Sequence, residues 1–171
     1  MFLEKLRLDD RVAVVAGGGR GSGLAGCEAS GKAGARTVIA EIDMDVVGEG
    51  RSCLKRYGVT AEAASLDVTD SQAITQLANA LVDLDGRVGV SVACTGIVRT
   101  GTPDGGVINE HWRNVNDVKD DGVLWCNRAL GRHMLHARRG AIGGVGYFRA
   151  SDAVSLMTGS VVTADGGFTC W

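Results

Sequence analysis

The sequence lacks the features that mark several special classes of protein. No apolar run approaches the length that a membrane-spanning helix needs, and Met1–Asp10 has no apolar core of the kind found in signal peptides. The five cysteines are scattered and include no Cys-x-x-Cys pair. A formal net charge of −2 gives no reason to expect nucleic acid or an anionic membrane as a partner. We therefore expect a cytoplasmic protein with reduced thiols.

Proline is almost missing as well. One proline stands against 26 glycines in 171 residues, and the glycines gather at the ends of short apolar runs. This pattern is typical of an α/β protein with many tight loops. A hydrophobic content of 45% with 22% charged residues is that of a globular protein, and the length suits one domain spanning residues 1–171.

Strand and helix patterns alternate along the chain. This alternation predicts a parallel sheet covered by helices on both faces, and we expect a curtailed, doubly wound, Rossmann-like α/β sheet of about six strands. The predicted strands are Val12–Ala16, Thr37–Ala40, Ala61–Leu66, Val88–Cys94, Ala141–Val145 and Ser160–Ala164. The predicted helices are Leu24–Ala33, Asp45–Tyr57, one that starts with the cap-and-Gln (capping-box) signal Thr69-Asp70-Ser71-Gln72 and runs to about Leu84, Asn109–Val118, Asp121–Arg139 and Phe148–Leu156.

The most informative segment is Val12–Gly23. Small apolar residues form a buried strand, and glycines then allow a tight turn into a helix because they carry no Cβ. The N–H groups and the positive dipole end of such a helix suit a pyrophosphate. The segment therefore predicts a dinucleotide-binding loop, with the candidate residues Gly17, Gly19, Arg20, Gly21, Ser22 and Gly23.

These motifs resemble the short-chain dehydrogenase/reductase family. The loop is similar to the family's Thr-Gly-x-x-x-Gly-x-Gly, with Ala16 in place of Thr. Further blocks follow in the family's order: Glu41 after the second strand, Leu66–Thr69, Ala93–Gly96, Phe148–Asp152 and Thr158–Gly167. Within the family, His111–Arg113 and the ending Gly167–Trp171 look most like polyol (sugar alcohol) dehydrogenases.

The resemblance implies a nicotinamide cofactor, with Asp67, Val68, Cys94 and Gly96 beside it. Asp67 is either an adenine contact or a helix-capping acid before Thr69. We interpret Cys94 as an apolar filler at a strand end rather than a nucleophile, because no histidine lies near it in sequence.

The choice of cofactor depends on Glu41. Its carboxylate would accept hydrogen bonds from both hydroxyls of the adenosine ribose and would repel a 2′-phosphate. Arg20 favours the opposite choice, since a basic loop residue can meet that phosphate. Glu41 lies at the ribose itself, so the sequence predicts NAD rather than NADP.

The family's catalytic segment is missing between Gly144 and Tyr147, where the family has a catalytic Ser and a helix bearing Tyr-x-x-x-Lys. The residue four positions after Tyr57 is alanine, and that after Tyr147 is serine. Lys119 occupies the family's fourth catalytic position, normally an Asn. Lys119 and Tyr147 are weak candidates for a substitute pair, and we interpret their placement as chance.

We therefore expect a protein that binds NAD(H) but is catalytically impaired or inactive. Two alternatives stay open. One is an active NAD-dependent oxidoreductase of sugar alcohols or other secondary alcohols, and the other is a non-catalytic partner subunit of a full-length relative. The small-molecule substrate is not indicated, because the elements that would shape its pocket are missing.

Two further expectations concern Asp121–Arg139. His133 and His136 lie one helical turn apart, but with no third ligand at helical spacing we interpret them as a solvated face rather than a metal site. The same helix offers an apolar stripe that predicts a homo-oligomer with an altered interface. The stripe consists of Val123, Leu124, Ala129, Leu130 and Met134.

Overall fold

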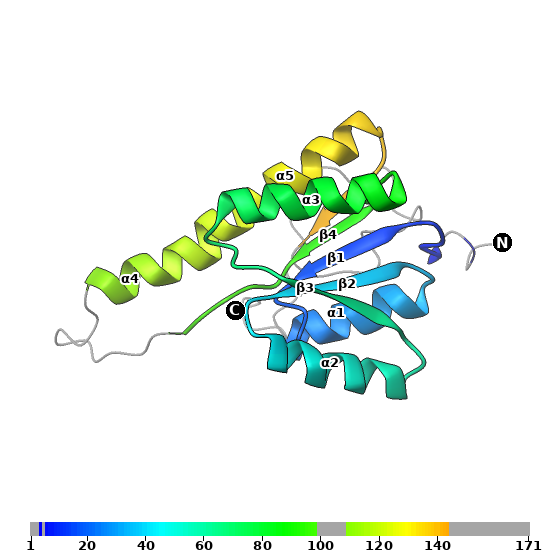
Figure 1. The fold of residues 1–171 in the computed structure, drawn as a ribbon, viewed down its shortest axis with the longest axis horizontal. Helices are drawn as coiled ribbons and strands as arrows, with labels where there is room; N and C mark the ends of the chain where they lie inside the picture. The colour runs from blue at the N-terminus through cyan, green and yellow to red at the C-terminus, as the bar shows by residue number, and fades with distance from the viewer. Residues whose placement is uncertain (1–3, 5, 99–108, 144–171) are drawn as a thin grey trace, which may run out of the picture.

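The computed structural model describes residues 4, 6–98 and 109–143. These residues form one parallel sheet of five strands in the order β3-β2-β1-β4-β5, with helices on both faces (Figure 1). The strands are β1 (Val12–Ala16), β2 (Arg36–Glu41), β3 (Ala61–Ser65), β4 (Val90–Ala93) and β5 (Ala141–Gly143). The predicted doubly wound parallel fold is confirmed. The sixth predicted strand and the helix before it lie outside the described residues.

The order of the strands places β1 at the centre of the sheet. Two consecutive crossovers build β2 and β3 on one side of β1, and the chain then returns to place β4 on the other side. Ala16 at the end of β1 pairs with Ala40 on β2 and with Ala93 on β4. The carboxyl ends of β1 and β4 therefore meet at the point where the winding reverses, which is where open α/β sheets bind ligands.

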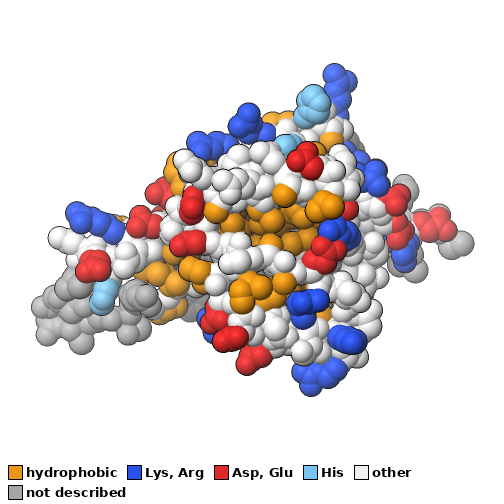
Figure 2. Space-filling view, in the orientation of Figure 1, with side chains coloured by type: hydrophobic (Ala, Val, Ile, Leu, Met, Phe, Trp, Pro, Cys, Tyr) orange, Lys and Arg blue, Asp and Glu red, His pale blue; other side chains and the backbone are white. Residues whose placement is uncertain are grey.

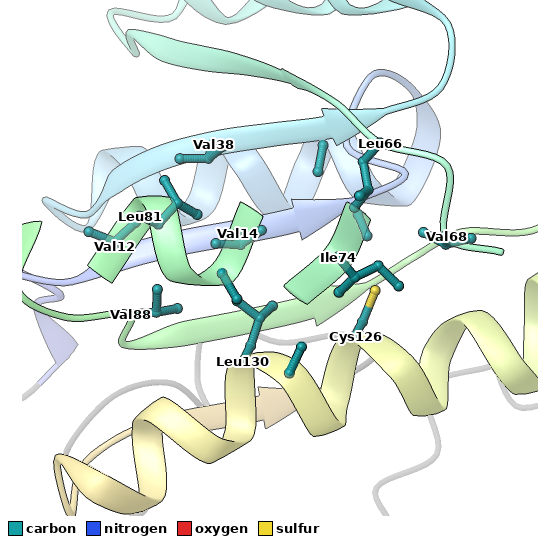
Figure 3. Packing of buried hydrophobic residues seen from close by; sticks show 14 of the residues in the cluster. Val12, Val14, Val38, Leu66, Val68, Ile74, Leu81, Val88, Cys126 and Leu130 are labelled. Carbon is teal, nitrogen blue, oxygen red and sulfur yellow. The ribbon is translucent and has the colours of Figure 1, made fainter. Parts of the chain in front are cut away.

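Each face of the sheet has its own hydrophobic core, because alternate residues of a strand point to opposite faces. On one face, α1 (Gly21–Lys32) and α2 (Met44–Arg56) pack through Cys27, Val47 and Leu54 against Ala13, Val15 and Ile39. On the other face, α3 (Ser71–Asp85) and α5 (Gly122–His136) cover Val12, Val14 and Val38 (Figure 3). The side chains from these two helices include Ile74, Leu81, Cys126 and Leu130.

Several helix ends differ from the prediction, and the starts of α1 and α3 bear on the loops at the carboxyl edge of the sheet. Helix α1 begins at Gly21 rather than Leu24, so Gly21 and Gly23 lie in its first turn. Helix α3 is capped by Asp70, whose Oδ1 accepts hydrogen bonds from the backbone N–H groups of Gln72 and Ala73 at 2.8 and 3.0 Å. The capping-box prediction, with Thr69 as the cap, is therefore wrong. A side-chain oxygen one residue nearer to the helix reaches the same N–H groups.

The last helical region is continuous rather than divided. Helix α4 (Asn109–Asn116) runs into a π-helical turn, η2 (Asp117–Asp121), which leads directly into α5. Helix α4 extends away from the sheet (Figure 1) and has no buried residue. None of the helices in the described ranges combines the length and the apolar character needed to cross a membrane.

The edge strand β3 is short and partly exposed. Figure 2 shows hydrophobic side chains in a band between α3 and α2, where β3 runs. Arg36 on β2 forms ion pairs with Glu62 on β3 and with Asp85 at the end of α3. These charges tie the edge strand to its neighbours, and charged side chains on an edge also discourage pairing with another chain.

The predicted oligomerisation stripe on α5 is largely wrong. Ala129, Leu130 and Met134 are buried in the chain's own core, facing α3 and the sheet. Only Leu124 of the larger predicted residues is exposed, at 53%. Sequence periodicity correctly found an apolar face, but this face packs inward.

Candidate nucleotide-binding site

The turn after β1 requires glycine at its first position. Gly17 has a φ of +75°, which L residues with a Cβ rarely adopt. Its N–H donates to the carbonyl of Ala40 at 2.9 Å, and a Cβ at this position would lie 2.7 Å from the backbone oxygen of Cys94. The loop therefore lies directly on the carboxyl end of β4, with no room for a side chain between them.

The rest of the loop is held equally closely. A Cβ on Gly23 would lie 2.0 Å from the carbonyl oxygen of Gly17, so the first turn of α1 packs against the loop that precedes it. A Cβ on Gly19 would lie 2.6 Å from Val46 on α2. Contacts from β4, α1 and α2 thus fix the backbone of this loop, and its glycines allow another group to approach closely.

The N-terminus of α1 is suited to an anion. Arg20 is the N-cap residue, with φ −155° and ψ 172°, and its side chain makes no capping hydrogen bond. The first turn contains no acidic residue, and the side chain of Ser22 is exposed. The N–H groups at the start of a helix need acceptors, and together with the helix dipole they favour a phosphate. The close-packed glycine loop and this uncapped helix end fit a pyrophosphate.

Glu41 ends β2 beside this loop. One of its carboxylate oxygens, Oε1, accepts a hydrogen bond from the backbone N–H of Ile42 at 3.1 Å. The side chain is half-buried. The preceding residue, Ala40, supplies the carbonyl that receives the Gly17 N–H. The carboxylate thus lies at the same edge of the sheet as the glycine loop, where it can accept further hydrogen bonds.

Asp67 shapes the loop between β3 and α3. Its Oδ1 accepts from the backbone N–H and from the hydroxyl of Thr69, at 2.9 and 2.8 Å. The alternative that Asp67 caps α3 is wrong, because Asp70 is the N-cap. Asp67 is exposed at the carboxyl edge, so its predicted contact with adenine stays a prediction.

Val68 is packed rather than exposed. It is 6% exposed and belongs to the core beneath α3 and α5. A Cβ on Gly122 would lie 2.8 Å from Cγ2 of Val68, so the start of α5 packs tightly on the β3–α3 loop. Sequence reasoning missed Gly122 as part of this arrangement. A glycine three residues after Lys119 within a helical pattern was the available signal.

The cysteines near the loop are inert fillers. Burial raises the pKa of the Cys27 thiol to about 12, and the nearby Cys94 adds to this effect. Burial also raises the pKa of the half-buried Cys94. Cys27 donates a weak hydrogen bond to the carbonyl of Gly18, with a sulfur–oxygen distance of 3.7 Å. Both sulfurs stay protonated at neutral pH, which agrees with the interpretation of Cys94 as a filler.

Lys119 lies near the same edge of the sheet. It is exposed on η2, and a Cβ on Gly96 would lie 3.3 Å from its Cε. The structure therefore brings Gly17, Cys94, Gly96 and Lys119 together. Tyr147, the other weak catalytic candidate, lies outside the described residues.

The two histidines lie away from this site. Nε2 of His133 is 3.0 Å from Oδ1 of Asn79 on α3, so the ring joins α5 to α3. Across residues 6–98 and 109–143, no three His, Cys, Asp or Glu side chains are grouped as metal ligands would be. Near the glycine loop, the described residues thus offer a ligand the N–H groups at the start of α1 and the carboxylate of Glu41.

Comparisons with known proteins agree with this geometry. The profile of the short chain dehydrogenase family matches residues 11–147. Galactitol 2-dehydrogenase from Rhizobium johnstonii is 37% identical over 145 residues, which cover 85% of this chain and 56% of that protein. The chain spans about half the length of the curated relatives it matches.

Solved structures extend the comparison to three dimensions. The crystal structure of gox2181 has a TM-score of 0.90 at 26% identity, with 100% of both chains covered. A metagenomic short-chain oxidoreductase in complex with NADP has a TM-score of 0.73 at 27% identity, covering 87% of this chain and 70% of that one. By sequence and by fold, this chain belongs to the short-chain dehydrogenase family.

Proposed function

We propose that this chain binds NAD(H) across the carboxyl ends of β2, β1 and β4, and that it does not turn over alcohols or ketones at an appreciable rate. The observation that carries the binding proposal is the glycine loop. Gly17 and Gly23 approach neighbouring backbone so closely that a Cβ would lie within 2.7 and 2.0 Å of it. Such close packing, next to an uncapped helix N-terminus, suits a pyrophosphate.

The proposed preference for NAD rests on Glu41. Its carboxylate lies at the end of β2, beside the strand that carries the glycine loop, and it would accept hydrogen bonds from a ribose diol. A 2′-phosphate in that position would meet a like charge. Arg20 is exposed at the loop and offers the opposite attraction. The proposal gives Glu41 the larger effect on cofactor choice, because the backbone N–H of Ile42 holds its carboxylate in position.

The proposed loss of turnover rests on the sequence. When bound, NAD would supply the hydride acceptor, but the protein must still move a proton at the substrate oxygen and position the substrate. Neither tyrosine has a lysine four residues later to lower its pKa. The residues that bind the cofactor are thus present without a recognisable proton relay.

A titration of the purified chain tests the binding proposal. We expect saturable binding of NADH, seen as enhanced nicotinamide fluorescence or as heat in calorimetry, with weaker binding of NADPH. The absence of NADH binding in a sample shown to be folded by circular dichroism would refute the proposal. Equal or tighter binding of NADPH would refute the role given to Glu41.

The second candidate function is an active oxidoreductase of polyols. The observation that favours it is the likeness to galactitol 2-dehydrogenase, at 37% identity over 145 residues. This function would require an acid–base group other than the family's Tyr and Lys. A partner subunit that associates with full-length relatives is the third proposal, and co-purification with such a relative would support it.

A further inference from the structure

The helix that carries Lys119 has an unusual local geometry. Residues Asp117–Asp121 form a π-helical turn between α4 and α5. Such turns are rare, and they occur frequently at functional sites because they redirect side chains from the regular helical pattern. Here the turn contains one basic residue among three aspartates. Lys119 is exposed, and within the described ranges no carboxylate lies at ion-pair distance from it.

Close packing fixes where this turn lies. Gly122, the first residue of α5, packs on Val68 so closely that a Cβ would lie 2.8 Å from Cγ2 of the valine. On the other side, Cε of Lys119 lies 3.3 Å from the Cβ position of Gly96. The lysine stem therefore crosses the loop that follows β4. Its ammonium is one bond farther on, at the carboxyl edge of the sheet.

The glycine loop reaches the same place from β1. Gly17 lies against the backbone of Cys94 and Thr95, the two residues immediately before Gly96. Lys119 is thus separated from the glycine loop by this short stretch of the β4 loop. The outermost atoms of the lysine are exposed and flexible, so they can reach a ligand that occupies this edge.

The order of the strands indicates which half of a dinucleotide Lys119 would meet. Glu41 and Asp67 follow β2 and β3, on one side of β1, whereas Gly96 and Lys119 lie at β4, on the other side. A dinucleotide bound at the reversal point extends to both sides of β1. With the adenosine at Glu41, the second phosphate and the nicotinamide ribose lie toward β4.

We propose that Lys119 is a cofactor-binding residue whose ammonium contacts the nicotinamide-side ribose-phosphate of NAD(H). The inference rests on the proposed function, because it needs a dinucleotide in the site. A lysine ammonium has three donors and a full charge, which suit phosphate and ribose oxygens. In this role Lys119 holds the ligand and takes no part in proton transfer.

The test compares ligands that contain different parts of the dinucleotide. NADH and ADP-ribose contain the nicotinamide-side ribose-phosphate, and AMP does not. Affinities are measured by calorimetry, or by NMR titration for the weak ligand AMP, for the unaltered chain and for Lys119→Ala and Lys119→Arg. The control is Lys55→Ala, which removes an exposed lysine near the end of α2.

We expect Lys119→Ala to weaken NADH and ADP-ribose by about tenfold each, the loss of one charge-assisted contact, with AMP unchanged. Lys119→Arg should retain most of the affinity, and Lys55→Ala all of it. Unchanged NADH affinity in Lys119→Ala would overturn the inference and leave the proposed function standing. An equal loss for AMP would also overturn it, because the effect would then not be local. If the unaltered, folded chain binds no NADH, both proposals fail.

Discussion

At the scale of single residues, the glycines of the loop differ in what they require. Gly17 has a positive φ, and a Cβ added to it would lie 2.7 Å from a backbone atom. Gly26 on α1 has an ordinary conformation, and a Cβ added to it would have no contact within 4 Å. Gly17 precedes α1 and Gly26 lies within it, so alanine substitutions at the two positions can be compared directly. Only the first belongs to the predicted nucleotide site.

This contrast predicts opposite results for two alanine substitutions. Gly17→Ala should abolish measurable NADH binding, because the loop must move away from β4 to accept the Cβ. Gly26→Ala should leave binding unchanged and stabilise the protein by about 0.5–1 kcal/mol, since alanine is the better helix former. Calorimetric titration and thermal unfolding measure the two effects. Normal NADH affinity in Gly17→Ala would show that the loop is only a structural turn.

Glu41 supports a second prediction at this scale. Replacement by Gln keeps the shape but removes the charge, so the ribose hydrogen bonds weaken and the repulsion of a 2′-phosphate disappears. NADH affinity should fall by about tenfold, and the preference for NADH over NADPH should fall with it. Titration of Glu41→Gln with both cofactors gives the ratio. Glu49→Gln on α2 is a control, and a preference unaltered by Glu41→Gln would contradict the role of Glu41.

At the scale of elements, the cap of α3 yields a test that distinguishes neighbouring residues. Asp70 accepts two backbone hydrogen bonds, whereas Asp67 and Thr69 bond to each other. Asp70→Ala should therefore destabilise the fold by about 1 kcal/mol, and Thr69→Ala by less. Urea unfolding of the two variants decides this. A larger loss in Thr69→Ala would restore the capping box that the sequence suggested.

The central strands were the most predictable elements, because burial on both faces leaves a continuous run of apolar residues in the sequence. Val12–Ala16 was predicted with its exact ends, and the other four strands in the described ranges were found within about two residues. The glycine loop was equally predictable, because a cluster of glycines directly after a buried strand indicates a tight turn rather than more strand. The doubly wound parallel sheet followed from the alternation of strands and helices, whereas the order of its strands comes from the structure.

The features that escaped prediction depend on contacts between distant segments. The π turn is followed directly by Gly122, which packs on Val68, a residue more than fifty positions away in sequence. Likewise, hydrophobic periodicity on α5 identified an apolar face but not its partner. That face packs on α3 and the sheet, so Leu130 and Met134 are core residues rather than interface residues.

At the scale of the whole molecule, apolar side chains remain uncovered on the long helical segment. Trp112 is 65% exposed, Leu124 53% and Leu135 80%. Helix α4 has no buried residue, and short helices without tertiary packing are marginally stable in water. In the described part of the chain, these residues offer an apolar surface for association.

We therefore expect the protein to associate as its concentration rises. Light scattering should show a mass that increases over the micromolar range, and Leu124→Lys with Leu135→Lys should shift it toward the monomer. Ile42→Lys, at an exposed residue that follows β2, is the control. A monomer whose mass is independent of concentration would contradict this expectation.

The whole molecule also decides whether binding leads to reaction. General acid–base groups typically contribute about 10²–10⁴-fold to rate, and the loss of substrate positioning removes more. We expect no oxidation of polyols or secondary alcohols and no reduction of the matching ketones above background, even where NADH binds. Absorbance of the reduced nicotinamide, followed with NAD(H) and NADP(H) at saturating cofactor, measures this. Turnover that disappears in Tyr147→Phe, with NADH affinity unchanged, would contradict the expectation. It would show that the chain has formed a new proton relay at the point where the family's catalytic segment is missing.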